Sequence, residues 1–239
     1  MAVETAGAAA VEVVDLASTP LRVVNQRLHD IAREGSGPQR FRILNPSGAH
    51  AIACGLDCEV EVEIEGHVGY YCAGMNKLAT VRVHGNAGVG LAENLMSGLV
   101  VVDGDASQAA GATGRGGLLV VRGNATARCG ISMKGIDIVV CGSVGPMSAF
   151  MAQRGRLVVC GDAGDALGDS IYEARLYVRG SVAGLGADCI AKEIRAEHAQ
   201  ELAELLVRAG IDDADPAEFR RYGSARQLYT FNVDNAGNY

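Results

Sequence analysis

The sequence predicts an all-β fold: a single-stranded, right-handed parallel β-helix of about seven coils, with capping α-helices at both ends. Three observations lead to this prediction. Glycine accounts for 32 of the 239 residues, one short motif recurs with a 19-residue period, and the repeat contains one convincing strand with glycine-rich corners but no room for a helix. A unit of this kind cannot bury its own apolar face, so it must stack in parallel on its neighbours.

The repeat is centred on a glycine that we predict to be structural. The seven central glycines are evenly spaced at the 19-residue period, without an insertion, and they are Gly66, Gly85, Gly104, Gly123, Gly142, Gly161 and Gly180. Apolar, mostly β-branched residues stand two and four positions before each of them, which is typical of a strand with one buried face. A polar residue follows each glycine, and a small apolar residue comes next and is expected to point inward.

We expect the glycine column to form corners of the coils. Glycine tolerates a positive φ, and the Asn, Asp or Ser that commonly follows it can bond local backbone. On this interpretation, Gly123→Val would destabilise the fold by several times the ~1 kcal/mol of an ordinary glycine change, because it places a bulky side chain in a crowded left-handed corner.

Other folds fit the period less well. A left-handed hexapeptide helix needs a six-residue period, and 19 is not a multiple of six. A leucine-rich repeat would have Leu at most inward positions, where Val dominates here. A propeller blade takes roughly 40 residues, and a Rossmann sheet needs helices between its strands.

The chain divides into three predicted parts. Residues 1–39 form an N-terminal segment with a capping helix, 40–187 form the β-helix, and 188–239 form a C-terminal capping helix and an extended arm. The stretch 40–65 resembles an irregular first coil. A stacked helix has two open edges, and caps at both ends would prevent polymerisation.

Both capping helices are predicted from their apolar periodicity. The first follows Ser18-Thr19-Pro20 and ends near Gly35, and Asp188 is expected to cap a second helix that ends at Gly210. The apolar positions are Leu21, Val24, Leu28 and Ile31 in the first helix, and Ile190, Ile194, Leu202, Leu205 and Leu206 in the second. The arm at 211–239 either packs along the coils or grips a partner.

Composition excludes several classes of protein. An apolar content of 49% and a net charge of −7 exclude a disordered chain. The acidic balance argues against nucleic acid as a partner, and no apolar run is long enough to predict a membrane span. Seven cysteines, an odd number, suit a reducing compartment, and the N-terminus does not read as a signal peptide. We therefore expect a cytoplasmic protein.

Four groups of residues could suggest chemistry, and each has a simpler structural explanation. The glycine-rich turn at 180–186 does not have the spacing of a phosphate-binding loop. Cysteines 54, 58 and 72 lack a fourth thiolate nearby for an iron–sulfur cluster, and buried free cysteine is common in tight cores. The candidate catalytic carboxylates are Glu93, Asp165, Asp169 and Glu173, and the only two histidines near one corner are His67 and His84. We predict no catalytic, cofactor-binding or metal-binding residue in this chain.

The glycine ladder, with the preceding segment TPLRVVNQRLHDIA, resembles the C-terminal β-helix (GXGXG) domain of the glutamate synthase large subunit. The C-terminal helix and the stretch FRRYGSARQLYTFNVDNAG are similar to the standalone form of that domain, as in N-methylglutamate synthase (methylamine–glutamate N-methyltransferase). The resemblance covers roughly residues 15–239. A subunit of formylmethanofuran dehydrogenase is similar to the same coils and remains an alternative, as does a subunit of a glutamate synthase proper.

The resemblance implies a non-catalytic scaffold subunit of a glutamate-synthase-like complex. The implied partners are a class II glutamine amidotransferase-like subunit and an FMN-binding glutamate synthase-like subunit. FMN and an iron–sulfur cluster would be held by a partner, and none by this chain. No functional side chain carries over, because the family motif consists of structural glycines.

Overall fold

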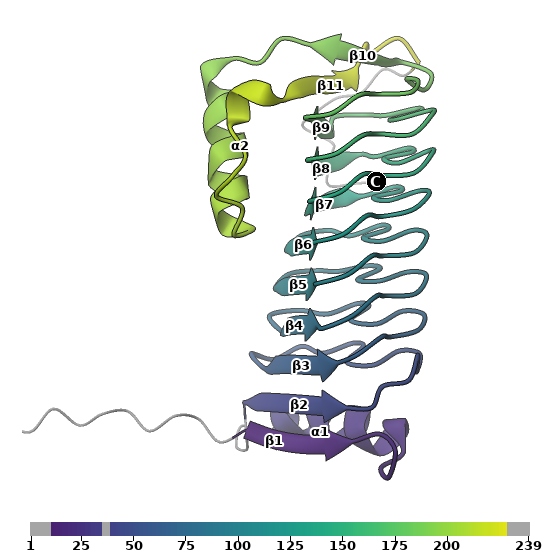
Figure 1. The fold of residues 1–239 in the computed structure, drawn as a ribbon, viewed down its shortest axis with the longest axis vertical. Coiled ribbons are helices and arrows are strands. Elements are labelled where there is room, and N and C mark those ends of the chain that lie inside the picture. Colours follow the sequence, from purple (N-terminus) through teal and green to yellow (C-terminus); the bar gives the residue numbers. More distant parts are fainter. Residues whose placement is uncertain (1–10, 35–38, 229–239) are drawn as a thin grey trace, which may run out of the picture.

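The computed structural model describes residues 11–34 and 39–228, and it confirms the predicted parallel β-helix (Figure 1). Eleven strands form one sheet in the order β1-β2-β3-β4-β5-β6-β7-β8-β9-β11-β10. The strands are β1 (Val11–Asp15), β2 (Arg40–Leu44), β3 (Glu61–Glu65), β4 (Thr80–Val83), β5 (Leu99–Val102), β6 (Leu118–Val121), β7 (Lys134–Val140), β8 (Arg154–Val159), β9 (Arg175–Val178), β10 (Cys189–Lys192) and β11 (Arg220–Ser224). The helices are α1 (Leu21–Glu34) and α2 (Ala196–Arg208), and a short 3₁₀ helix spans Pro216–Glu218.

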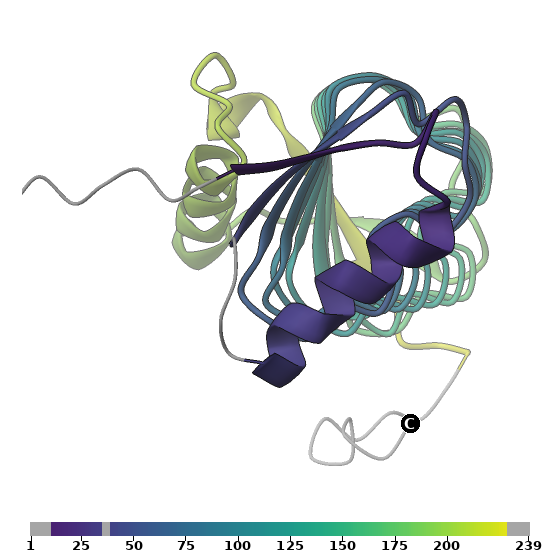
Figure 2. The same ribbon diagram turned by 90° about the horizontal axis from the view of Figure 1, so that it is seen from below.

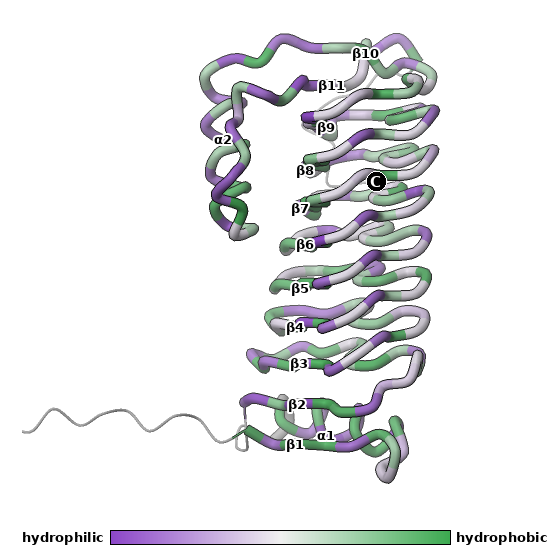
Figure 3. The backbone as a smooth tube through the Cα atoms, in the orientation of Figure 1, coloured by the Kyte–Doolittle hydropathy of each residue, from purple (hydrophilic) through white to green (hydrophobic). Residues whose placement is uncertain are grey.

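The coils stack in register with the sequence period. From β3 to β9 every strand pairs in parallel with the next, and paired residues such as Val81 and Val100 are one period apart. A second line of parallel bridges runs from Val68 to Val182 through the small apolar residue of each coil. Most members of this column are buried, which confirms that it points inward. Similar hydrophobic and hydrophilic stretches therefore recur from coil to coil (Figure 3).

The glycine column itself is not a row of left-handed corners. Among its seven members only Gly66 has a positive φ, of 131°. The other six are required by close approach between coils. A Cβ on Gly123, for example, would lie 2.8 Å from the carbonyl oxygen of Gly104 and closer still to Asp105 Oδ1. The predicted backbone conformation was therefore wrong, while lack of space explains the glycine.

The residues with left-handed backbone lie instead in another corner of each coil, and many of them are not glycine. Three alternate residues of one turn, Tyr71, Ala73 and Met75, have φ values of 59°, 54° and 60°. The same three columns recur with the period of the ladder and include Met147, Ala149 and Met151. Single left-handed residues of this kind cost free energy, so the stacked backbone hydrogen bonds of the coils must hold them in place.

The N-terminal end is closed as predicted, with one addition. Helix α1 crosses the end of the stack (Figure 2), and its Val24 and Leu28 are fully buried in the core. The sequence did not reveal β1, which pairs in parallel with β2 and extends the sheet by one strand. The predicted helix end near Gly35 agrees with Glu34 as the last helical residue, and Gly35 itself is outside the described residues.

The C-terminal part differs more from expectation. Asp188 is not a helix cap; its carboxylate accepts hydrogen bonds from Ser224 and Gln227, and strand β10 follows it. Helix α2 begins at Ala196 and runs along the side of the stack (Figure 1). Its Leu202, Leu205 and Leu206 cover the outer face of strands β5 to β9. The antiparallel strands β11 and β10 lie beyond β9 at the end of the sheet.

The described part of the arm packs in cis. Residues 220–222 pair with β9, and Phe219 is buried under α2 in the second core. The stretch from residue 229 onward lies outside the described residues. Within the described ranges, neither helix has the length and apolar character needed to cross a bilayer.

Candidate functional site

The residue after each ladder glycine links one coil to the next. Side chains of this column accept hydrogen bonds from the backbone N–H of the equivalent residue in the next coil, in place of the local backbone bonds that we expected. The series runs His67 to Asn86, Asn86 to Asp105, Asp105 to Asn124, Asn124 to Ser143, Ser143 to Asp162 and Asp162 to Ser181, at 2.7–3.0 Å. This column is therefore a structural device that fixes the spacing of the coils.

The cysteines do not form a ligand set. Cys72 is fully buried, and burial raises the pKa of its thiol to about 12, as expected of a cysteine that packs in the core. Cys54 and Cys58 are partly exposed, and the three thiols do not converge on one point among the described residues. Cys141 and Cys160 directly follow β7 and β8 in adjacent coils, and all seven cysteines are free.

The four candidate carboxylates lie in different surroundings. Glu173 accepts from Arg226 at 2.6 Å, and Asp169 accepts from Ser170 Oγ at 2.7 Å. Asp165 lies against Gly184, where a Cβ would overlap its carboxylate. Burial raises the pKa of Glu93. Among the described residues, no two of these carboxylates contact each other, so they do not form an acid–base pair.

The glycine-rich turn at 180–186 is also structural. Gly180 continues the ladder, and a Cβ on Gly186 would overlap backbone of Asp169 in the preceding coil. The element that follows is strand β10 and not a helix. The strand–turn–helix context of a phosphate-binding loop is therefore missing at this position.

The structure gathers one possible metal-ligating set that sequence reasoning missed. Potential ligand atoms of Glu63, Glu65 and His84 all lie within 4.8 Å of one another. Glu65 and His84 share the outward column before the ladder glycine, so the column could have revealed them. Arg42 donates to Glu65 at 2.7 Å and His84 contacts Asp103 at 2.7 Å, so these groups belong to an exposed network of ion pairs between coils.

A partly buried polar cluster joins α2 to the coils. Arg156 donates two hydrogen bonds to Asp137 of the preceding coil, at 2.6 and 2.5 Å. Arg208 of α2 reaches the same carboxylate at 3.4 Å. The Tyr177 hydroxyl donates to Glu201 of α2 at 2.8 Å, and burial together with this bond raises the tyrosine pKa.

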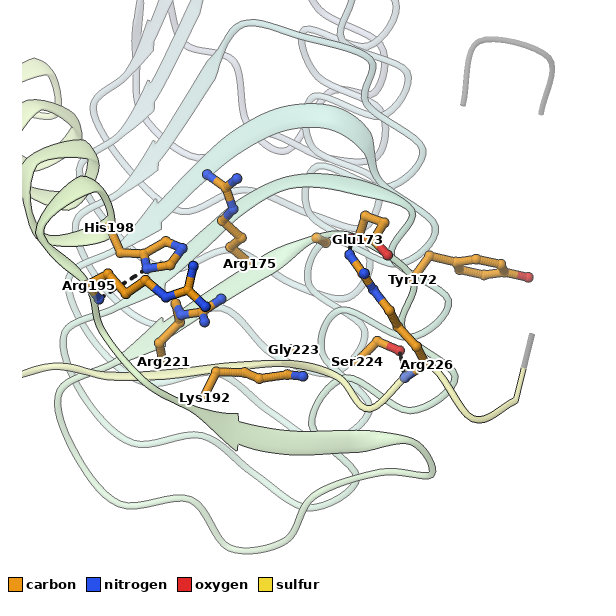
Figure 4. A pocket seen from close by; sticks show the side chains of 11 residues that line it. Tyr172, Glu173, Arg175, Lys192, Arg195, His198, Arg221, Gly223, Ser224 and Arg226 are labelled. Carbon is orange, nitrogen blue, oxygen red and sulfur yellow. Dashed lines mark hydrogen bonds and ion pairs between the residues drawn. The ribbon is translucent and has the colours of Figure 1, made fainter. Parts of the chain in front are cut away.

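A basic pocket of about 350 Å³ lies between the start of α2 and the last three strands of the sheet (Figure 4). Its cationic residues come from five places: Arg175 begins β9, Lys192 ends β10, Arg195 precedes α2, Arg221 lies in β11 and Arg226 follows it. His198 in the first turn of α2 and Ser224 at the end of β11 also line it. Glu173 is its only carboxylate among the described lining residues.

The sequence alone did not show that these arginines line one cavity. Nothing in the 19-residue period indicated that the chain returns antiparallel to β9 after α2. Because β11 inserts between β9 and β10, residues far apart in the sequence, such as Arg175 and Arg221, line one cavity. The one signal available was the density of Arg and Lys after residue 175 in an acidic chain.

An exposed apolar turn stands out on the surface of the coils. Met75 and Leu78 are 55% and 53% exposed, and Tyr70, Tyr71 and Met96 are also accessible. Leu78 and Met96 lie on neighbouring coils. The backbone N–H of Leu78 donates a hydrogen bond to the hydroxyl of Ser97, the residue that follows Met96. We name Tyr70, Tyr71, Met75, Leu78 and Met96 the apolar turn. Exposed apolar side chains gathered in this way are typical of interaction surfaces.

Comparison with known proteins gives one informative relative. No family model matches the chain. Protein GlxC from Rhizobium meliloti (strain 1021) is 65% identical over 227 residues, which cover 95% of this chain and 99% of that protein. The chain belongs to the family of protein GlxC.

Proposed function

We propose that this chain is a non-catalytic scaffold subunit of a glutamate-synthase-like complex. The observation that carries the proposal is the periodic glycine ladder, whose coils resemble the β-helix domain of the glutamate synthase large subunit. The interior of the coils is filled by aliphatic side chains from one contiguous core, which makes the stack a stiff spacer. The outer surface is then the part that can contact other subunits.

We further propose N-methylglutamate synthase as the complex, which forms N-methylglutamate and ammonia from glutamate and methylamine. The partners would be a class II glutamine amidotransferase-like subunit and an FMN-binding glutamate synthase-like subunit, which usually also carries an iron–sulfur cluster. In this division of labour the β-helix keeps the two partners in register. The match to 99% of GlxC is consistent with a family in which the β-helix is the main body of the chain.

The apolar turn is the surface at which we expect a partner to dock. Its exposed Met75 and Leu78 would become buried in a complex and would gain roughly 25 cal/mol per Å² of apolar surface removed from water. Helix α2 already covers the outer face of β5 to β9. A partner therefore meets open coils mainly on the remaining surfaces.

Affinity purification of the tagged chain from its native host tests the proposal. We expect co-purification of a flavoprotein with bound FMN and of an amidotransferase-like chain, and their loss with a Met75→Glu, Leu78→Glu double variant. Val207→Glu is the matched control, because Val207 is 70% exposed on α2. Recovery of the chain alone, or with molybdenum or tungsten proteins, would contradict the proposal.

A further inference from the structure

The basic pocket beside α2 is a feature that a spacer role does not require. The whole chain carries a net charge of −7, yet five cationic side chains line this one cavity and a single carboxylate faces them among the described lining residues. Like charges held close together destabilise a fold unless they have partners. Each of these cations is therefore stabilised by a nearby negative charge, which can come from the protein or from a ligand.

Three of the five cations have carboxylate partners. Arg175 forms an ion pair with Glu201, which also attracts Arg156. Arg195 lies 3.7 Å from Glu197 and 4.0 Å from Glu193, both largely exposed. Arg226 pairs with Glu173 at 2.6 Å. The two remaining cations of the pocket are Lys192 and Arg221.

Arg221 and Lys192 form no direct ion pair with a carboxylate of the described chain; Asp188 attracts Lys192 and Glu201 attracts Arg221 only at longer range. Arg221 uses its Nε to donate to the backbone carbonyl of Glu193 at 2.9 Å, which leaves the terminal nitrogens of its guanidinium for a ligand. Burial lowers the pKa of Arg221, and the nearby Arg175 and Arg195 lower it further. The Lys192 side chain extends along the same cavity wall (Figure 4).

His198 adds a directed neutral donor. Its side chain is 7% exposed, and its Nδ1 lies 3.2 Å from the backbone N–H of Arg195, from which it accepts a hydrogen bond. The proton of the neutral ring is then on Nε2, which has no protein partner among the described contacts. Burial and the positive charges of Arg221 and Arg175 lower the pKa of His198, so the ring is neutral near pH 7.

We propose that this pocket binds a small dianion, held by Arg221 and Lys192 with a hydrogen bond from His198. Guanidinium groups bind carboxylate and phosphate oxygens in pairs, whereas an ammonium group acts as a point charge. A dicarboxylate and a phosphate-bearing molecule share this chemistry, and a volume of about 350 Å³ suits a compact ligand. The proposal goes beyond the scaffold role and does not depend on it.

Titration calorimetry of the isolated chain tests the pocket. The probes are sodium phosphate and sodium glutarate, each compared with sodium chloride at equal ionic strength. We expect at least one of the two dianions to bind saturably with one site per chain. Lys192→Gln and Arg221→Gln should each weaken that binding at least tenfold, because each removes one of the two positive charges that have no direct ion pair.

Lys77→Gln is the matched control, because it removes the same charge from an exposed position far from the pocket in the sequence. Melting temperatures show whether each variant is folded, and Lys192→Gln keeps the test valid if Arg221→Gln does not fold. Saturable binding of phosphate alone assigns a phosphate-bearing ligand, and binding of glutarate alone assigns a dicarboxylate. The proposal is overturned if neither binds more than chloride, or if Lys77→Gln weakens binding as much as Lys192→Gln.

Discussion

Asp105 accepts a hydrogen bond from the backbone N–H of Asn124 in the next coil, with 2.7 Å between Oδ1 and N. This bond places the carboxylate where a Cβ on Gly123 would have to lie. Glycine is thus required at position 123 because the Asp105 side chain lies against its Cα while it bonds to the backbone of the next coil. The same relationship recurs at Gly104, Gly142, Gly161 and Gly180, so the glycine and the polar residue after it form one device.

Gly123→Ala should lower the free energy of unfolding by about 1–3 kcal/mol, as overpacking commonly does. The added methyl would meet the Gly104 carbonyl oxygen at 2.8 Å and displace Asp105 from its bond. Gly223→Ala is the control, because its nearest atom would be 3.7 Å away and its φ is not positive. Urea unfolding compares the two, and equal losses would contradict the close-approach explanation.

Stability should depend on the ionisation of Asp162 at low pH. The Ser181 backbone N–H and hydroxyl donate to this carboxylate and lower its pKa in the folded state. A lowered pKa means that the stabilisation is complete above the unfolded value of ~3.9 and is lost as pH falls through the folded pKa. The melting temperature of the wild type relative to Asp162→Asn should therefore decline below about pH 4. If the difference in melting temperature between the two proteins were constant from pH 7 to pH 3, the ionised Asp162 carboxylate would not contribute to stability.

Most of the fold could be predicted because it is local and repeated. Each coil contacts only its neighbours, so a motif such as Val121-x-Gly123 specifies both its own strand and the pairing with the coils before and after it. The period also determined which side chains are buried. It could not reveal why glycine is needed, because a positive φ and a close approach both select the same residue.

The C-terminal region could not be predicted because it departs from the repeat. The sequence from Cys189 has helical periodicity, yet Cys189–Lys192 pairs with β11, which follows only after the whole of α2. Such non-local pairing overrides local propensity. The basic pocket depends on that pairing, which is why Arg221 and Lys192 were not expected to share a site.

Leu205→Ala should destabilise the protein by about 2–4 kcal/mol, as for other fully buried leucines. Leu205 is 1% exposed between α2 and the outer face of the coils. Val207→Ala, at a position that is 70% exposed on the same helix, should change stability by less than about 0.5 kcal/mol. Thermal and urea unfolding measure both. A similar loss for the two variants would mean that α2 does not pack on the coils in solution.

The Asp137–Arg156 pair should show strong energetic coupling. Asp137 is buried and bound twice by Arg156, so removing one partner leaves a charge with little solvation. A double-mutant cycle with alanine should give a coupling free energy of about 1–3 kcal/mol. The exposed pair Arg40–Glu61, which also joins two coils at 2.6 Å, should give no more than about 1 kcal/mol. Equal coupling in the two cycles would contradict this assignment.

Alkylation should distinguish the cysteines of the first coils. Burial raises the pKa of Cys72 to about 12, so at pH 8 the thiol stays protonated and very little reactive thiolate is present. Cys58 is partly exposed and should react with iodoacetamide much faster, as measured by mass spectrometry of peptides over time. In urea both should react at similar rates, because unfolding removes the burial. Rapid labelling of Cys72 in the folded chain would show that the core of the first coils opens readily, and would weaken the interpretation of this cysteine as a packing residue.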